Sequence, residues 1–409
     1  MDTLETQKLQ DPSKVRGVIF LFSAAYLISY LTRINFGAII SEMEAQTGMA
    51  RSLLSQAVTG AFITYGAGQL ISGFLGDRIQ PKRLLLIGLL LTASMNMLIP
   101  FCGSAGLMTA VWAVNGFAQS LMWPPMVRLM VTFLNGEDYK RACFVVTCAG
   151  SMGTVLIYLA SPMIIALSGW RMVFFFCSLA AIVMAVFWQK NCMDVPVEKA
   201  AGKRMMGNRA EGLFSPLLIA ILFAITLCGI LRDGVTTWMP SYISETYNLS
   251  STTSILSGVI MPIFGIICSR LAMIVYRKMP MNPILCAGIF FAVGASAAFG
   301  INVLTGSSAA ASVGLTAVLT GCMHGVNLML ISMLPPFFQK KGNISFISGL
   351  LNSFVYIGSA ISTYGIALIS ESRGWGTTVF LWMLIAIAGT AICCICIPGW
   401  KKMVAEAED

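Results

Sequence analysis

Long apolar runs alternate with short polar segments along almost the whole chain. Runs of about 20 apolar residues are long enough to cross a bilayer core of about 30 Å. Twelve such runs cover residues 17–40, 53–75, 83–101, 107–131, 143–167, 171–189, 214–239, 252–275, 282–303, 308–336, 344–370 and 377–398. This pattern predicts an all-α membrane protein with twelve transmembrane helices.

The overall composition supports this prediction. Of the 409 residues, 57% are hydrophobic and only 11% are charged, whereas soluble domains carry about 25% charged residues. The twelve cysteines are scattered through the apolar runs without the spacing of a metal site, so we expect them to be small packing residues. We expect no cofactor, and we expect no enzyme because no nucleophile lies near a base.

The basic residues are distributed unevenly between the two sides of the predicted membrane. If the N-terminus is cytoplasmic, nearly all Lys and Arg residues outside the runs fall in cytoplasmic segments, and only Arg51, Arg171 and Arg373 fall outside. The positive-inside rule therefore predicts a plasma (inner) membrane protein with cytoplasmic N- and C-termini. This topology also accounts for the net charge of +9 without a nucleic-acid partner.

A single long polar stretch divides the chain into two six-helix halves. We expect residues 190–213 to be a cytoplasmic linker between bundles at 1–189 and 214–409. Sequence landmarks recur in the two halves at a spacing of about 200 residues. Arg33 corresponds to Arg232, Pro124-Pro125 to Pro335-Pro336, Gly169-Trp170 to Gly374-Trp375, and Gly73-x3-Asp77-Arg78 to Gly265-x3-Ser269-Arg270. Two related bundles with a binding site between them indicate an alternating-access carrier.

An arginine lies inside the first apolar run, where a charge costs about 2.5–3.5 kcal/mol on insertion scales. Tyr26, Tyr30 and Arg33 are spaced i, i+4 and i+7, so they share one face of the predicted helix. We expect Arg33 and Arg232 to face each other across a central cavity and to bind an anion with their planar guanidiniums. A phosphate monoester, with a charge of about −1.5 to −2, matches two arginines better than a monocarboxylate does. Snorkelling of Arg33 to the interface is the structural alternative.

One acidic residue, Asp233, lies deep within an apolar run. Proton symporters usually keep carboxylate relays in the membrane, so a single candidate favours anion exchange. Because adjacent helical positions diverge by about 100°, we expect Asp233 to pair with another helix or to line the cavity rather than to face Arg232. His324, the only histidine, could bond to substrate or titrate near neutrality, or could be a packing residue.

Two further segments carry polar residues at unusual positions. Pro124-Pro125 follow Asn115 and Gln119 in the fourth run and predict a helix kink, with substrate contact and a purely structural role both open. In the cytoplasmic loop after the second run, Asp77 and Arg78 could form ion pairs that hold the carrier closed to the inside and break during transport. A basic loop that only sets topology is the alternative for this segment.

These residues resemble two nested families. The loop Gly73-x3-Asp77-Arg78-x2-Pro81-Lys82 resembles that of the major facilitator superfamily. The stretch around Arg33, together with Gln119-x3-Trp123-Pro124-Pro125 and Leu231-Arg232-x-Gly234, resembles the organophosphate:phosphate antiporter family. The resemblance implies that Arg33 and Arg232 bind phosphate. It also implies that the two halves of the protein rock against each other and so exchange a phosphorylated metabolite for inorganic phosphate. It implies a wall of cavity aromatics at Tyr26, Tyr30, Tyr65, Trp123 and Tyr356.

Four positions depart from the pattern of this family. Gln69 stands where glycerol-phosphate and hexose-phosphate carriers have a lysine, and Gly150 stands where the glycerol-phosphate carrier has a histidine. His324 replaces an aromatic residue, and Asp233 is an added acid, so we expect Gln69 and His324 to contact the substrate. Two arginines and one aspartate leave a cavity charge of about +1, which suits a zwitterionic phosphorylated or phosphonate compound, or a carboxylate.

The sequence thus predicts a monomeric transporter of a small organic anion. Its expected partners are an organophosphate or phosphonate, inorganic phosphate and the lipid bilayer. Two alternatives stay open. One is a proton-coupled symporter of an organic carboxylate such as a sugar acid, in which Asp233 or His324 titrates. The other is a transporter-like membrane sensor that binds its ligand without moving it.

Overall fold

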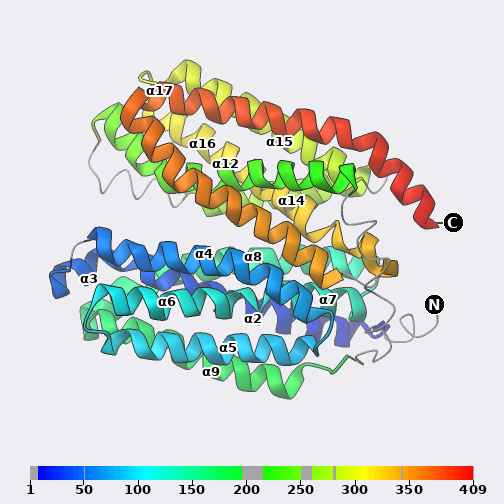
Figure 1. Ribbon diagram of the computed structural model, residues 1–409, viewed down its shortest axis with the longest axis horizontal. Coiled ribbons are helices and arrows are strands. Elements are labelled where there is room, and N and C mark those ends of the chain that lie inside the picture. Colours follow the sequence, from blue (N-terminus) through cyan, green and yellow to red (C-terminus); the bar gives the residue numbers. More distant parts are fainter. Residues whose placement is uncertain are drawn as a thin grey trace. The chain divides into compact units, whose positions relative to one another are not determined.

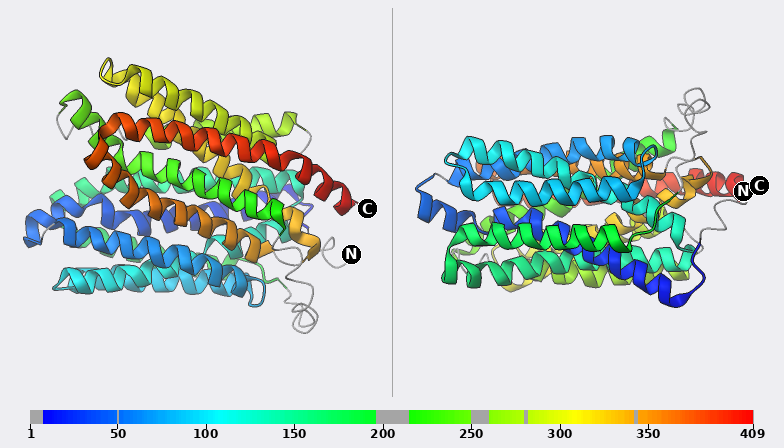
Figure 2. Two further views of the ribbon diagram at one scale, coloured as in Figure 1. Left: turned by 45° about the horizontal axis from the view of Figure 1, so that its top comes forward. Right: turned by 90° about the horizontal axis from the view of Figure 1, so that it is seen from below.

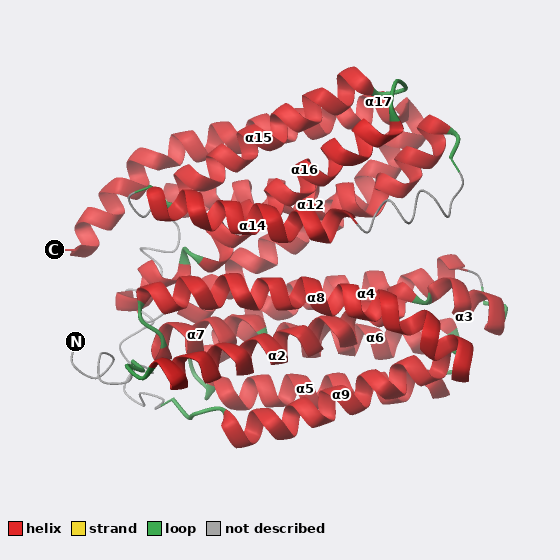
Figure 3. Cartoon of the chain, turned by 180° about the vertical axis from the view of Figure 1, so that it is seen from behind, coloured by secondary structure: helices red, strands yellow, loops and turns green. Residues whose placement is uncertain are grey.

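The structure is a computed structural model that describes residues 8–49, 51–195, 215–249, 260–279, 282–341 and 344–408. Helices are the only regular secondary structure in these ranges (Figure 3). Each of the twelve apolar runs is mainly helical over its described residues, which confirms the all-α prediction.

The chain divides into two compact units. Unit 1 consists of Met1–Val197 and Phe338–Ser353, and unit 2 consists of Glu198–Phe337 and Phe354–Asp409. The expected linker at 190–213 lies mostly outside the described residues, so the bundle limits 1–189 and 214–409 stay predictions. Figure 2 shows that the helices within each unit run side by side along their length.

Unit 1 begins with the helix that carries Arg33. Asp11 caps this helix by accepting a hydrogen bond from the backbone N–H of Ser13 at 2.8 Å, and Pro12 occupies its first turn. The helices of this unit are α2 (Pro12–Ala38), α3 (Ile40–Thr47), α4 (Arg51–Gly76), α5 (Pro81–Leu98), α6 (Ala105–Ser120), α7 (Trp123–Phe133), α8 (Gly136–Ser168) and α9 (Trp170–Asn191), with the short helix η1 (Ile99–Phe101) after α5 (Figure 1).

The fourth apolar run is broken into two helices, as the paired prolines predict. Helix α6 ends at Ser120 and α7 begins at Trp123, with Pro124 and Pro125 in its first turn. Proline lacks a backbone N–H and is tolerated best in the first turn of a helix. The hydroxyl of Ser345 donates to the carbonyl oxygen of Pro124 at 2.9 Å, so one carbonyl near the break gains a side-chain partner.

Unit 2 contains the helices that carry Arg232 and His324. They are α12 (Pro216–Tyr247), α14 (Ile260–Lys278), α15 (Pro283–Leu304), α16 (Ala309–Asn327) and the π-helical segment η2 (Leu328–Ser332). The 3-10 segment η3 (Pro335–Lys341) and α17 (Ile344–Glu408) are divided between the units, because Phe338–Ser353 belongs to unit 1 and the rest of both belongs to unit 2. Pro335 and Pro336 begin η3, shortly after η2, so the second proline pair also coincides with a departure from α-helix.

Two glycines at corresponding positions of the repeat have the same backbone conformation. Gly169 has φ 81° and ψ 166°, and Gly374 has φ 77° and ψ 174°. These positive φ values favour glycine, which has no Cβ. Each glycine ends one helix and is followed by a tryptophan, Trp170 or Trp375, that begins the next. The conformation therefore confirms the repeat at this landmark, and it divides α17 into two helices.

Ten helices in the described residues are long and apolar enough to cross a membrane. The two expected spans that are not among them are 53–75 and 107–131. The first forms α4, whose apolar sequence is interrupted by polar residues such as Gln69 and Ser72. The second is divided into α6 and α7, of 16 and 11 residues. These two spans and the ten apolar helices together match the twelve expected runs.

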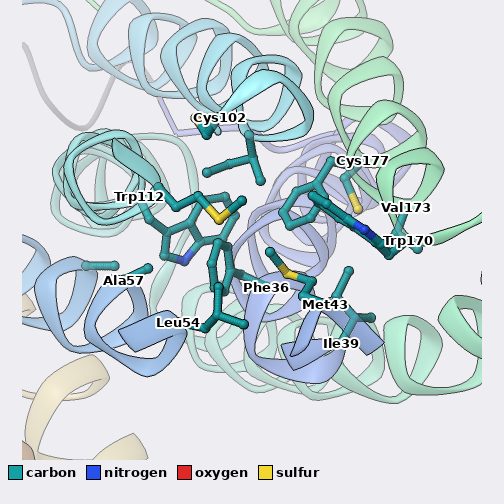
Figure 4. Close-up of a cluster of buried hydrophobic side chains, with 14 of the residues drawn as sticks. Phe36, Ile39, Met43, Leu54, Ala57, Cys102, Trp112, Trp170, Val173 and Cys177 are labelled. Carbon is teal, nitrogen blue, oxygen red and sulfur yellow. The ribbon is translucent and has the colours of Figure 1, made fainter. Parts of the chain in front are cut away.

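A cluster of aromatic residues fixes α2 within unit 1. The ring centroid of Phe36 lies 5.1 Å from that of Trp112 on α6 and 5.8 Å from that of Phe174 on α9. Trp170 packs edge-to-face on Phe174 at 5.9 Å. Figure 4 shows this side of α2 enclosed by buried residues from several helices. Because Phe36 follows Arg33 by one turn, the cluster also helps to position the arginine.

Candidate functional site

The guanidinium of Arg33 lies on two tyrosine rings. Its central carbon is 4.2 Å from the ring centroid of Tyr30 on the same helix and 4.9 Å from that of Tyr65 on α4. A cation on an aromatic face is stabilised by about 0.5–2 kcal/mol, more when it is desolvated. Tyr65 is buried, with 3% of its surface exposed. Tyr30 and Arg33 therefore lie on one face of α2 as predicted, and α4 contributes the second ring, Tyr65, that contacts the guanidinium.

Aromatic contacts continue from Tyr30 to the broken span. Tyr26 packs edge-to-face on Tyr30 with ring centroids 5.1 Å apart, and it lies 5.0 Å from the ring of Trp123 at the start of α7. A Cβ added at Gly150 of α8 would lie 2.9 Å from the ring of Tyr30 and 3.0 Å from that of Tyr26. Gly150 therefore makes room for both tyrosines. Five predicted site residues form this continuous cluster: Tyr26, Tyr30, Arg33, Tyr65 and Trp123.

Gln69 lies one helical turn after Tyr65 on α4 and is completely buried. Neither its side-chain oxygen nor its side-chain nitrogen has a hydrogen-bond partner in the described residues. The indole N–H of Trp123 is buried and unpaired in the same way. A buried polar group without a partner costs about 1–3 kcal/mol, so such groups usually bind water or a ligand. Gln69 and Trp123 are therefore suited to hydrogen-bond a polar molecule.

A second side of α2 is also polar. Ser29 donates to the side-chain oxygen of Gln119 at 2.7 Å, and the amide nitrogen of Gln119 donates to the hydroxyl of Thr32 at 2.9 Å. Asn96 and Asn115 both donate to the backbone oxygen of Thr32, at 3.2 and 3.3 Å. Asn115 and Gln119 thus hold α2 against α6, which favours the structural role left open for them.

Arg232 forms a two-point ion pair with its neighbour in sequence. Its Nε donates to Oδ1 of Asp233 at 2.6 Å, and its Nη2 donates to Oδ2 at 2.7 Å. Its Nη1 donates to the side-chain oxygen of Asn327 at 2.8 Å. The expectation that adjacent positions would not face each other was wrong, because the long arginine side chain bends back to reach the carboxylate. Asp233 also accepts a hydrogen bond from Ser359 of α17, so it contacts a second helix as predicted.

The helices that carry this ion pair approach each other closely. A Cβ at Gly229 of α12 would lie 2.1 Å from the carbonyl oxygen of Val355, and one at Gly358 would lie 2.1 Å from that of Thr226. Only glycine permits this approach at both positions. The approach brings Ser359 to Asp233. Tyr356, one turn before Ser359, is buried with 9% of its surface exposed.

His324 lies on α16, one turn before Asn327. Its ring packs against α14 at Gly265, where an added Cβ would be 3.0 Å from Cδ2. The charges of Arg232 and Asp233 are close enough to act on the imidazole of His324. The structure thus brings the predicted unit 2 residues Arg232, Asp233 and His324 into one polar group, completed by Asn327 and Ser359.

The predicted gating loop contacts the first turn of α17. The two carboxylate oxygens of Asp77 accept hydrogen bonds from the backbone N–H groups of Ser345 at 3.1 Å and Phe346 at 2.9 Å, in the first turn of α17. A carboxylate at this position satisfies helix N–H groups that lack an intrahelical partner and complements the helix dipole. The guanidinium of Arg78 stacks on the ring of Phe74 at 3.5 Å.

Arg33 belongs to unit 1 and Arg232 to unit 2. Their predicted arrangement across a central cavity therefore stays a prediction.

Comparison with known proteins identifies the family. The sequence profile described as Major Facilitator Superfamily matches residues 22–363, which is most of the chain. The chain belongs to the Major Facilitator Superfamily. This membership confirms the fold class predicted from the twelve apolar runs and the resemblance of the Asp77-Arg78 loop.

Two facilitator relatives cover nearly the same length. The "Membrane sensor protein UhpC" of Escherichia coli is 23% identical over 389 residues, covering 88% of this chain and 87% of the relative. The "Probable hexose phosphate transport protein" of Chlamydia muridarum is 22% identical over 441 residues, covering 97% and 94%. The solved structure of the proton:xylose symporter XylE superimposes with a TM-score of 0.75 at 12% identity, covering 93% of this chain and 95% of XylE. This last likeness concerns the fold alone.

Sequence reasoning missed two members of the polar group in this facilitator. Asn327 and Ser359 were not among the predicted site residues, yet they bind Arg232 and Asp233. A signal for both was present, because each follows a predicted site residue, His324 or Tyr356, by three positions. Residues three apart share a helix face, so a polar residue there belongs to the same surface.

Proposed function

We propose that this facilitator is an alternating-access secondary transporter of a small organic anion. Its proposed substrate is an organophosphate or phosphonate that exchanges for inorganic phosphate. The observation that carries the proposal is the pair of intramembrane arginines at corresponding repeat positions, with Arg33 on the faces of Tyr30 and Tyr65. The chlamydial relative named as a probable hexose phosphate transport protein supports the phosphate head group.

The arginines would bind the phosphate, and the surrounding residues would select the organic part. Guanidinium forks match phosphate oxygens in geometry and charge. Tyr26, Tyr30, Tyr65, Trp123 and Tyr356 would form an aromatic wall with few charged groups. Gln69 would offer one donor and one acceptor, both buried and unpaired in the described residues, to a hydroxyl or amide of the substrate. His324 would face the cavity from unit 2.

The loop after α4 would control access to the site. Asp77 caps α17 through two hydrogen bonds from Ser345 and Phe346. We infer that these bonds form and break as the carrier alternates, while Arg78 contributes charge to the same loop. The distribution of Lys and Arg supports a plasma (inner) membrane location with cytoplasmic N- and C-termini. We propose a monomer as the working unit.

Exchange in proteoliposomes tests the proposal. Vesicles loaded with phosphate should take up radiolabelled phosphate, and an organophosphate substrate should inhibit this uptake. Arg33→Ala and Arg232→Ala should each abolish exchange, because removal of a guanidinium that binds a charged ligand costs several kcal/mol. The matched control is Arg83→Ala, since Arg83 is exposed in the first turn of α5. Normal exchange by both site variants would refute the proposed site.

A sensor is the second candidate, because the Escherichia coli relative is named as a membrane sensor protein. A sensor would bind the organophosphate without exchanging it. Saturable binding by the purified protein, combined with no exchange in the same preparation, would favour this candidate. Phosphate self-exchange would exclude it as the main activity.

A further inference from the structure

The guanidinium of Arg232 is already held by a carboxylate of the protein itself. Asp233 occupies its Nε and Nη2 with both carboxylate oxygens, at 2.6 and 2.7 Å, and Asn327 occupies Nη1. A two-point fork of this kind is the geometry in which arginine binds a phosphate or carboxylate ligand. Asp233 therefore takes the place that a substrate head group would need on this side of the site.

We propose that the transported anion displaces Asp233 from Arg232 and that the released Asp233 carboxylate binds one proton, so that each anion is bound together with a proton. This inference rests on the proposed function, because it requires Arg232 to bind the anion. It adds a proton to the cargo of an exchange that would otherwise involve anions alone.

The charges of the site favour this coupling. Arg33, Arg232 and the ionised Asp233 together carry +1, so a bound phosphate dianion would leave −1 inside the membrane. Protonation of Asp233 raises the sum to +2, and the dianion then makes the occupied site neutral. An uncompensated charge in the membrane interior costs several kcal/mol. The Asp233 carboxylate and the substrate anion compete for one guanidinium, so binding of the substrate is favoured when Asp233 is protonated.

The surroundings of Asp233 can accept the protonated form. The groups around the carboxylate of Asp233 are its ion-pair partner Arg232 and Cys228 from α12, His324 from α16, and Tyr356 and Ser359 from α17. Ser359 donates to the carboxylate in the ion pair, and its hydroxyl can rotate to accept a hydrogen bond from a protonated Asp233. The proton is taken up from the bulk solution, where the buffer acid supplies it, forms an O–H bond on a carboxylate oxygen, and returns to the solution when Asp233 returns to Arg232.

Calorimetry on the purified full-length protein tests this proposal. Inorganic phosphate is titrated near neutral pH in two buffers with different ionisation enthalpies, which yields the number of protons taken up per bound phosphate. The wild type should take up about one proton more than Asp233→Asn, in which the competing carboxylate is gone. Protonation of phosphate itself is common to both proteins and cancels in the difference.

The pH dependence should change in the same variant. Proton uptake means that phosphate affinity falls as pH rises, by up to about tenfold per pH unit in the wild type relative to Asp233→Asn. The matched control is Glu245→Gln, which neutralises another unit 2 carboxylate that accepts a hydrogen bond from Trp375 and does not contact Arg232. This control should keep the wild-type proton uptake.

Three outcomes would overturn the proposal while leaving the proposed function intact. Wild-type protein could bind phosphate with no more proton uptake than Asp233→Asn. His324→Gln could lose the uptake while Asp233→Asn keeps it, which would place the proton on the histidine. If Asp233→Asn does not fold, infrared difference spectra of the wild type decide, because phosphate should produce a new protonated-carboxyl band and its absence would refute the proposal. No phosphate binding by the wild type would overturn both the proposed function and this inference.

Discussion

The close approach of α12 and α17 predicts a strong effect of one added methyl group. In Gly358→Ala, the new Cβ would lie 2.1 Å from the carbonyl oxygen of Thr226, whereas ordinary contacts begin at 3.4 Å. The helices must therefore separate by about 1.3 Å, the difference between these distances. Because the obstacle is backbone rather than a flexible side chain, rotamer changes cannot relieve it.

The magnitude follows from two opposing effects. Overpacking of this kind costs about 1–3 kcal/mol, and replacing a helical glycine by alanine contributes about 1 kcal/mol of stability. The matched control is Gly365→Ala in the same helix, where an added Cβ has no atom within 4 Å. Both variants gain the helix propensity, so Gly358→Ala should be less stable than Gly365→Ala by about 1–3 kcal/mol.

Thermal unfolding with a thiol-reactive dye measures this difference. Ten of the twelve cysteines are buried, so the dye reports loss of packing. A difference of 1 kcal/mol corresponds to about 2–4 °C in a unit of 150–250 residues. Phosphate exchange should fall in Gly358→Ala, because Ser359 moves away from Asp233. A melting temperature equal to that of Gly365→Ala, with normal exchange, would show that the reasoning from close packing is wrong.

Substitutions at three other positions test separate parts of unit 1. Gly150→Ala should lower stability by about 1–3 kcal/mol in the same dye assay, because the new Cβ displaces Tyr30, and an unchanged melting temperature would count against the aromatic cluster. Asp77→Asn should accelerate amide hydrogen exchange at Ser345 by about 10-fold or more, since hydrogen bonds to a charged group contribute about 1.5–3 kcal/mol; unchanged protection would contradict the capping role. Gln69→Lys should lower the Kd for phosphate measured by calorimetry and Gln69→Leu should raise it, whereas equal affinities would remove Gln69 from the site.

Much of the fold could be predicted because its physical basis is local in sequence. A bilayer requires apolar runs of a fixed length, and these runs are visible without knowledge of any contact. Gly169 was also informative about the repeat, because a backbone position with positive φ favours glycine and so keeps the same residue in both halves. The two spans that are not among the ten apolar helices, at α4 and α6–α7, contain the buried Gln69 and the proline pair Pro124-Pro125, which lower their apolar character or break the helix.

The candidate site was predicted best where its residues share one helix. Tyr26, Tyr30 and Arg33 follow a simple periodicity, and the structure places them in contact. The Arg232–Asp233 pair was mispredicted because periodicity describes where side chains leave the helix and not how far a long side chain can bend. The partners Asn327 and Ser359 come from other helices, and helix packing cannot be read from spacing along one chain.

The polar face of α2 that carries Ser29 and Thr32 has a consequence for how substrate preference can change. Rotation of α2 by one residue, about 100°, would break the hydrogen bonds that Ser29 and Thr32 make with Gln119, and lipid offers no replacement partners. The direction of Arg33 is therefore maintained by hydrogen bonds on another face of its helix. Under the proposed function, substitutions at Gln69 of α4 can then alter the accepted organic group while Arg33 keeps its direction, so new specificities can arise without rebuilding the charged centre.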